Sequence, residues 1–122
     1  RLQVGRKTEL IQCVLATGFP YDIATHPVNN VDYFTGMAPK TRAIRRMGAA
    51  AYDLACVASG KFDGFWELQL SPWDVAASML FVREAGGVII PFRTDRKISI
   101  VAGNETISRQ ILAELRQIDG LV

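Results

Sequence analysis

The stretch FWELQLSPWDVAASMLFVREAGG, residues 65–87, joins an apolar strand to an apolar helix. A run of aromatic and aliphatic residues predicts the strand over 62–70, with a turn or bulge near its start. The helix is predicted over 71–85, because Ser71 suits an N-cap, Pro72 suits the first helical position, and a glycine pair follows. A strand that leads directly into such a helix is typical of layered α/β proteins.

Strands and helices are predicted to alternate along the rest of the chain as well. We expect strands over 9–16, 41–47, 88–92 and 97–103, and a loop over 17–27. A mostly helical stretch is expected over 29–40, and a helix over 49–59 that ends at Gly60. Asn104 is expected to cap a C-terminal helix, which has Ile107, Ile111, Leu115 and Ile118 on one face. There are no internal repeats or linkers. The sequence therefore predicts one compact α/β unit over 1–122.

Composition excludes several classes of protein. The 122 residues are 49% apolar and 21% charged, which is typical of a globular domain with a real core. A net charge of +2 is too small to indicate a nucleic-acid or anionic-membrane partner. No apolar run approaches the roughly 18 residues that span a bilayer. Cys13 and Cys56 form no CxxC pair, so we expect buried thiols in a reducing compartment, the cytoplasm.

Asp74 stands in the first turn of the helix that follows Ser71. One interpretation is structural: Ser71 and Asp74 resemble a capping box, with Asp in place of the usual Glu. The other is functional. No residue from Val75 to Val82 is charged, so we expect the helix body to be buried and the acid at its start to meet a bound group. The residues alone leave both interpretations open.

A second helix start, RRMGAAAYD at residues 45–53, combines Gly48 with three alanines. Small residues allow close approach, and the first amides of a helix have no partner within it, so they suit a phosphate or another polar oxygen. Tight helix packing is the structural alternative. Glu67 is a further acid, at the end of an apolar strand, where a solvated strand end is the structural alternative.

Taken in order, these segments resemble the C-terminal half of the inositol monophosphatase family of metal-dependent phosphatases. The resemblance rests on Gly48-Ala49-Ala50, Trp66-Glu67, Trp73-Asp74-Val75-Ala76-Ala77 and Glu84-Ala85-Gly86-Gly87, and LATGFPY at 15–21 is similar to the strand and loop that begin this half. Two positions depart from the family pattern: Ala49 lacks the hydroxyl of many members, and Ser78 replaces a glycine. The resemblance covers essentially the whole chain and implies a mixed sheet flanked by helices.

The resemblance also implies a chemistry. Asp74 would be a Mg²⁺ ligand that approaches the substrate's hydroxyls, and Mg²⁺ prefers such carboxylate oxygens. Glu67 would contact the sugar or inositol ring, together with the backbone of Gly48, Ala49 and Ala50. The implied reaction is hydrolysis of a small phosphate monoester, first of all inositol 1-monophosphate, in which metal ions polarise the phosphate and activate water.

The family's other metal ligands, a Glu-Glu pair and an Asp-Pro-x-Asp-Gly-Thr segment, do not occur in these 122 residues. We therefore expect this chain to be the C-terminal lobe of a longer enzyme, inactive alone, with the N-terminal half and a second copy of the protein as partners and no membrane partner. Fructose-1,6-bisphosphatase, histidinol-phosphatase and nucleotide 3′-phosphatase activities remain alternatives within the superfamily. A non-catalytic interaction or dimerisation module is the alternative outside it.

Several other side chains receive structural interpretations. The basic segment KTRAIRR, residues 40–46, lacks interleaved aromatic residues, so the pattern disfavours nucleic-acid binding. We expect Arg45 or Arg46 to lie at the rim of the site or in a subunit contact. His26 has no partner at metal-ligand spacing and is expected to be solvated. Trp73, like Trp66, is expected in the core as part of the site wall.

Overall fold

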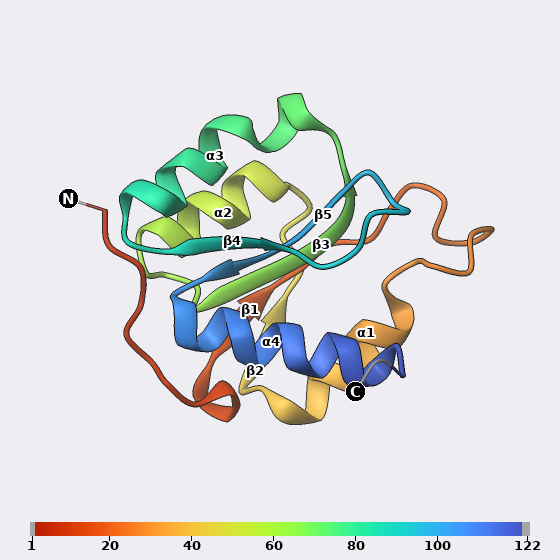
Figure 1. Cartoon of the computed structure of the whole chain (residues 1–122), viewed down its shortest axis with the longest axis horizontal. Coiled ribbons are helices and arrows are strands. Elements are labelled where there is room, and N and C mark those ends of the chain that lie inside the picture. The colour runs from red at the N-terminus through yellow and green to blue at the C-terminus, as the bar shows by residue number, and fades with distance from the viewer. Residues whose placement is uncertain (1, 121–122) are drawn as a thin grey trace.

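A five-stranded mixed sheet forms the centre of the computed structural model, which describes residues 2–120 (Figure 1). Its strands are β1 (Val14–Ala16), β2 (Ala43–Arg45), β3 (Gly64–Leu70), β4 (Val88–Pro91) and β5 (Ile98–Gly103), in the order β2-β1-β3-β5-β4. β1 runs parallel to β2 and β3, whereas β5 runs antiparallel to β3 and β4. The predicted mixed sheet with flanking helices is confirmed.

Helices cover both faces of the sheet. They are α1 (Val31–Met37), α2 (Ala50–Ala58), α3 (Pro72–Glu84) and α4 (Glu105–Ile118), with short 3₁₀ turns η1 (Leu10–Gln12) and η2 (Ala38–Lys40). Helices α2 and α3 pack together on one face, and α1 and α4 on the other (Figure 1). The chain is thus a three-layer α/β/α sandwich.

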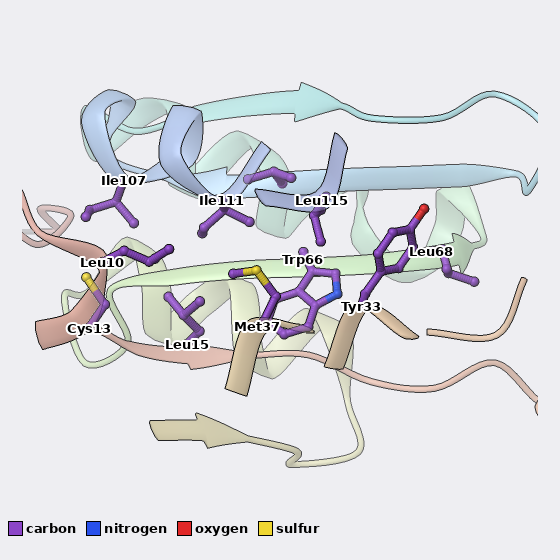
Figure 2. Close-up of a cluster of buried hydrophobic side chains, with 11 residues drawn as sticks. Leu10, Cys13, Leu15, Tyr33, Met37, Trp66, Leu68, Ile107, Ile111 and Leu115 are labelled. Atoms are coloured by element: carbon purple, nitrogen blue, oxygen red, sulfur yellow. The ribbon is translucent and has the colours of Figure 1, made fainter. Parts of the chain in front are cut away.

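Strand β3 supplies side chains to both cores. Trp66 and Leu68 point to the layer of α1 and α4, while Phe65 points to the layer of α2 and α3, as the two-residue period of a strand requires. Figure 2 shows the first core, in which the predicted apolar face of α4 packs over β1 and β3. The predicted Asn104 cap is also confirmed, because its Oδ1 accepts from the Ile107 amide at 2.8 Å.

The first strand is shorter than the 9–16 that the apolar run predicts. Residues Leu10–Gln12 form a 3₁₀ turn, closed by the Cys13 amide, which donates to the Leu10 carbonyl at 3.0 Å. The side chain of Gln110 on α4 accepts from the Leu10 amide at 3.1 Å and holds the turn in place. A contact with a residue distant in sequence therefore overrides the local strand preference.

The prediction that α3 and Trp73 are buried is wrong for the chain as described. Val75 and Val82 are buried, but Trp73 is 81% exposed, and Leu80 and Phe81 are about half exposed at 52% and 45%. The reason is that α3 contacts α2 and the sheet along one side only. Within residues 2–120, no further layer covers its outer side.

Two observations concern the surroundings in which the chain works. Both Cys13 and Cys56 are buried free thiols, as predicted. Across residues 2–120, none of the helices has the length and apolar character needed to cross a bilayer.

Candidate functional site

A pocket of about 480 Å³ opens where β1 and β3 end and where α2 and α3 begin. Because β1 and β3 are parallel, their carboxyl ends meet at one edge of the sheet, where ligands bind in many α/β proteins. All residues that the sequence nominated for the site line this pocket, namely Gly48, Ala49, Ala50, Glu67 and Asp74. Segments separated by up to 26 positions in the sequence are thus brought to one cavity.

A buried hydrogen-bond network fixes the strand end that carries Glu67. The indole of Trp66 donates to Asn30 Oδ1 at 2.7 Å, and Asn30 Nδ2 donates to Thr17 Oγ1 at 3.0 Å and to the Gly18 carbonyl at 2.7 Å. The Thr17 hydroxyl in turn donates to the Trp66 carbonyl at 2.5 Å. These bonds hold the loop after β1 against the end of β3, since buried networks with satisfied partners are rigid.

Gly18 allows this loop to lie directly on the Glu67 carboxyl group. A Cβ atom at position 18 would lie 2.6 Å from Glu67 Oε1, closer than any real contact of this kind. The loop backbone and the acid therefore form one wall, and a larger residue at position 18 would displace the acid. No sequence pattern predicts these roles: Thr17 and Gly18 are recognisable only as part of the strand and loop at 15–21, and no local signal marks Asn30.

The environment of Glu67 favours its neutral form. Burial, the largest cause, and the charges of Asp53 and Asp74 together raise the pKa of this half-buried carboxyl group to about 7, although Arg46 lowers it. Near neutral pH the group is therefore present in both protonation states. It can accept a hydrogen bond as a carboxylate or donate one as an acid.

Asp53 is a third acid of the pocket, beyond the residues predicted from the sequence. It lies in the first turn of α2, is 1% exposed, and its Oδ1 has no hydrogen-bond partner among the residues that the structure describes. Burial raises the pKa of its carboxyl group to about 6. The signal that could have identified it is its position as the one charged residue in an otherwise apolar helical segment, 49–59.

The two helix starts differ from simple caps. At α2, Gly48 has a positive φ of 87°, Ala49 provides no side-chain cap, and the first helical bond runs from the Asp53 amide to the Ala49 carbonyl. The amides of the preceding turn are therefore outside the helical ladder. At α3, Ser71 occupies the N-cap position but makes no cap hydrogen bond, and the carboxylate of Asp74 is exposed toward the pocket.

The pocket has an acidic lining with one base. Asp53, Glu67 and Asp74 line it together with Arg46, whose guanidinium carbon lies 5.1 Å from the centre of the Phe19 ring, a cation–π contact. This agrees with the prediction that Arg45 or Arg46 lies at the rim. An anionic ligand would be repelled by this lining unless cations accompanied it.

The acids do not form a complete metal site by themselves. Among residues 2–120, no group of three or more His, Cys, Asp or Glu side chains is placed to hold one ion. Of the three acids, Asp74 is the most accessible to a cation, because it is exposed while Glu67 is half-buried and Asp53 is buried.

His26 lies apart from this pocket. It is half-buried rather than fully solvated, because its Nδ1 accepts from the Val28 amide at 3.0 Å and so closes a local turn. The side chain has a structural role in the loop that precedes α1.

Known proteins place this fold and pocket in a family. The model of the inositol monophosphatase family matches residues 1–119. The chain is 38% identical to an inositol-1-monophosphatase of Mesorhizobium japonicum, covering 96% of this chain and 46% of that protein, and 39% identical to the Nus factor SuhB of Pseudomonas aeruginosa, covering 95% and 45%. The solved structure of inositol monophosphatase from Anabaena superposes with a TM-score of 0.90 at 38% identity, covering 95% of this chain and 48% of that one. The chain spans about half the length of these relatives. It belongs to the inositol monophosphatase family.

Proposed function

We propose that this chain is the substrate-side lobe of a Mg²⁺-dependent phosphatase that hydrolyses a small polyol phosphate monoester, with inositol 1-monophosphate as its first substrate. The observation that carries the proposal is the acidic pocket at the two helix starts, in a chain of this family. The lobe spans residues 1–122, and the N-terminal half of the enzyme would complete the catalytic centre.

Asp74 is the residue of this lobe that would hold Mg²⁺. Its carboxylate is exposed at the pocket, so a hard cation can reach its oxygens. A bound Mg²⁺ would supply charge for the phosphate oxygens and an activated water. The acidic lining supports this role, because a phosphate ester needs cations to enter a pocket with three acids and one base.

Glu67 and the start of α2 would bind the polyol part of the substrate. Glu67 is held by the network around Trp66, and its pKa of about 7 allows it to accept or donate a hydrogen bond to a ring hydroxyl. The backbone of Gly48, Ala49 and Ala50 lies at the same pocket, and helix amides outside the ladder suit ligand oxygens.

We further propose a cytoplasmic homodimer as the working form of the enzyme. The buried free thiols support a reducing compartment. The outer side of α3 exposes apolar side chains that another protein surface would cover, and we assign that surface to the N-terminal half of the same enzyme. Size-exclusion chromatography with light scattering of the full-length protein tests the dimer, and a monomer at micromolar concentration would contradict it.

Activity of the full-length protein tests the function. We expect Mg²⁺-dependent release of phosphate from inositol 1-monophosphate, with lower kcat/KM on fructose 1,6-bisphosphate, histidinol phosphate and a nucleoside 3′-phosphate. A higher kcat/KM on one of the latter would reassign the substrate within the superfamily. Some relatives are named Nus factor SuhB, so a non-catalytic interaction module is the alternative. We would assign the full-length protein to that class if it bound no polyol phosphate and released no phosphate.

A further inference from the structure

Asp53 stands out among the buried acids because its Oδ1 has no hydrogen-bond partner within residues 2–120. The other buried acid of the described chain, Asp63, accepts from Lys7 Nζ at 3.0 Å and from the Val14 amide at 2.8 Å. Asp53 is equally inaccessible at 1% exposure, yet its Oδ1 lacks any partner among residues 2–120. A buried carboxyl group without a donor is costly, so such groups are normally hydrogen-bonded.

The unpaired acid is located at the pocket and not in the closed core. Asp53 lines the cavity together with Glu67, and the negative charge of Asp53 is one of the causes of the raised Glu67 pKa. Two other buried atoms without partners, Arg96 Nε and Ser108 Oγ, belong to residues that do not line this cavity. The partner that Asp53 lacks can therefore come from the pocket contents.

A hydrogen donor fits the missing partner better than Mg²⁺ does. Bound Mg²⁺ keeps several waters, and Asp53 is only 1% exposed, whereas Asp74 is exposed. A carboxyl oxygen at a pocket wall accepts hydrogen bonds from hydroxyl groups, which a polyol carries in number and a simple aryl phosphate lacks.

We propose that Asp53 is a specificity-determining residue of this pocket, which accepts a hydrogen bond from a substrate hydroxyl, directly or through one bound water. The assignment rests on the proposed function, because it deepens the choice of a polyol phosphate as substrate. Asp53 acts on the uncharged part of the substrate, so it selects among esters by their hydroxyl groups and leaves the phosphorus chemistry to the metal side of the site.

The test compares Asp53→Ala and Asp53→Asn with wild type in the full-length protein, on inositol 1-monophosphate and on p-nitrophenyl phosphate. We expect Asp53→Ala to lower the ratio of kcat/KM for the polyol ester over the aryl ester about 10- to 150-fold, the value of one hydrogen bond to a charged group. Asp53→Asn keeps an acceptor oxygen and should retain part of that ratio. Ser108→Ala is the matched control, since it also removes a buried unpaired oxygen but leaves the pocket unchanged.

Two results would overturn the assignment. Equal losses on both esters, or no loss on either, would remove Asp53 from substrate selection. A lowered melting temperature in both Asp53 variants but not in Ser108→Ala would assign it a structural role, because removing an unpaired buried acid should leave stability equal or higher.

Calorimetric binding of inositol 1-monophosphate separates this assignment from the proposed function. If wild type binds the ester without turning it over, the phosphatase proposal fails, and weaker binding by Asp53→Ala still supports the Asp53 assignment. If wild type does not bind the ester, both fail.

Discussion

Asp74→Asn is the substitution that separates a metal ligand from a helix cap. Asn keeps the size of the side chain and an acceptor oxygen but removes the negative charge. In the structure, the carboxylate of Asp74 is exposed in the first turn of α3, and no side chain caps that helix. The helix therefore loses only a charge–dipole contribution of about 0.3–1 kcal/mol, so unfolding of the metal-free protein should change little.

The effect on turnover should be much larger. Substitution of residues that merely support metal ligands costs about 10–100-fold in metal affinity or activity, so loss of a direct ligand should cost more than about 100-fold. Without metal, stability can even rise slightly, because one acid fewer faces Glu67 in the pocket.

The assay measures phosphate release by the full-length enzyme across a Mg²⁺ titration, together with thermal melting in EDTA. Glu84→Gln is the matched control, because Glu84 is an exposed acid at the opposite end of the same helix. We expect normal activity in the control and lost activity with retained melting temperature in Asp74→Asn. Full activity of Asp74→Asn at limiting Mg²⁺ would refute the reasoning and leave Asp74 with a purely structural role at the helix start.

Four further predictions address the site and the isolated chain. Glu67→Gln should weaken binding of the polyol product by about 1–3 kcal/mol and leave Mg²⁺ affinity unchanged, as measured by isothermal titration with inositol and with Mg²⁺. Weaker Mg²⁺ binding with unchanged inositol binding would contradict the assigned role. Glu67 has a pKa of about 7 in the folded protein against 4.5 for an ordinary Glu, so the folded state holds this proton more tightly than the unfolded state. The free energy of unfolding should therefore fall as the pH rises from about 4.5 to 7, and this fall should be smaller in Glu67→Gln. The same pH profile in both proteins would count against the raised pKa. Purified residues 1–122 alone should release no phosphate from a monoester, and Mg²⁺-dependent turnover would contradict this. They should also self-associate through the exposed side of α3, and a monodisperse monomer with a cooperative melt would contradict that.

Gly18→Ala tests how the loop after β1 supports the acid and is the last of this group. The added Cβ would lie 2.6 Å from Glu67 Oε1, so the flexible end of the Glu67 side chain must move aside, at little cost in stability. Polyol binding should weaken while the melting temperature changes little, and unchanged binding would show that the pocket does not depend on this contact.

The sequence predicted the order of elements well because most of them carry a clear period or a cap. The apolar stripe of α4 and the Asn104 cap are local signals, and both recur in the structure. Glu67 and Asp74 are visible in the sequence as acids at the end of an apolar strand and the start of an apolar helix, but their predicted roles follow from the resemblance to the family. Parallel β1 and β3 then bring these element ends to one edge, which the sequence pattern alone does not specify.

The features that sequence reasoning missed depend on long-range geometry. The network of Thr17, Asn30 and Trp66 joins residues up to 49 positions apart, and no local pattern marks it. The expectation that Trp73 lies in the core is wrong, because the burial of a side chain on α3 depends on which side of the helix meets α2. Asp53 carried a visible signal, a lone charge in an apolar helix, which only its burial and missing partner turn into a site residue.

The most direct test of the account is a crystal structure of the full-length protein with inositol 1-monophosphate and Mn²⁺ in place of Mg²⁺, since the anomalous signal locates the ion. The account predicts a metal ion within about 2.0–2.3 Å of an Asp74 carboxylate oxygen, the distance typical of Mg²⁺-like coordination. It also predicts ring hydroxyls within hydrogen-bond distance of Glu67. A metal ion bound away from Asp74, or an inositol ring outside the pocket between β3, α2 and α3, would contradict it.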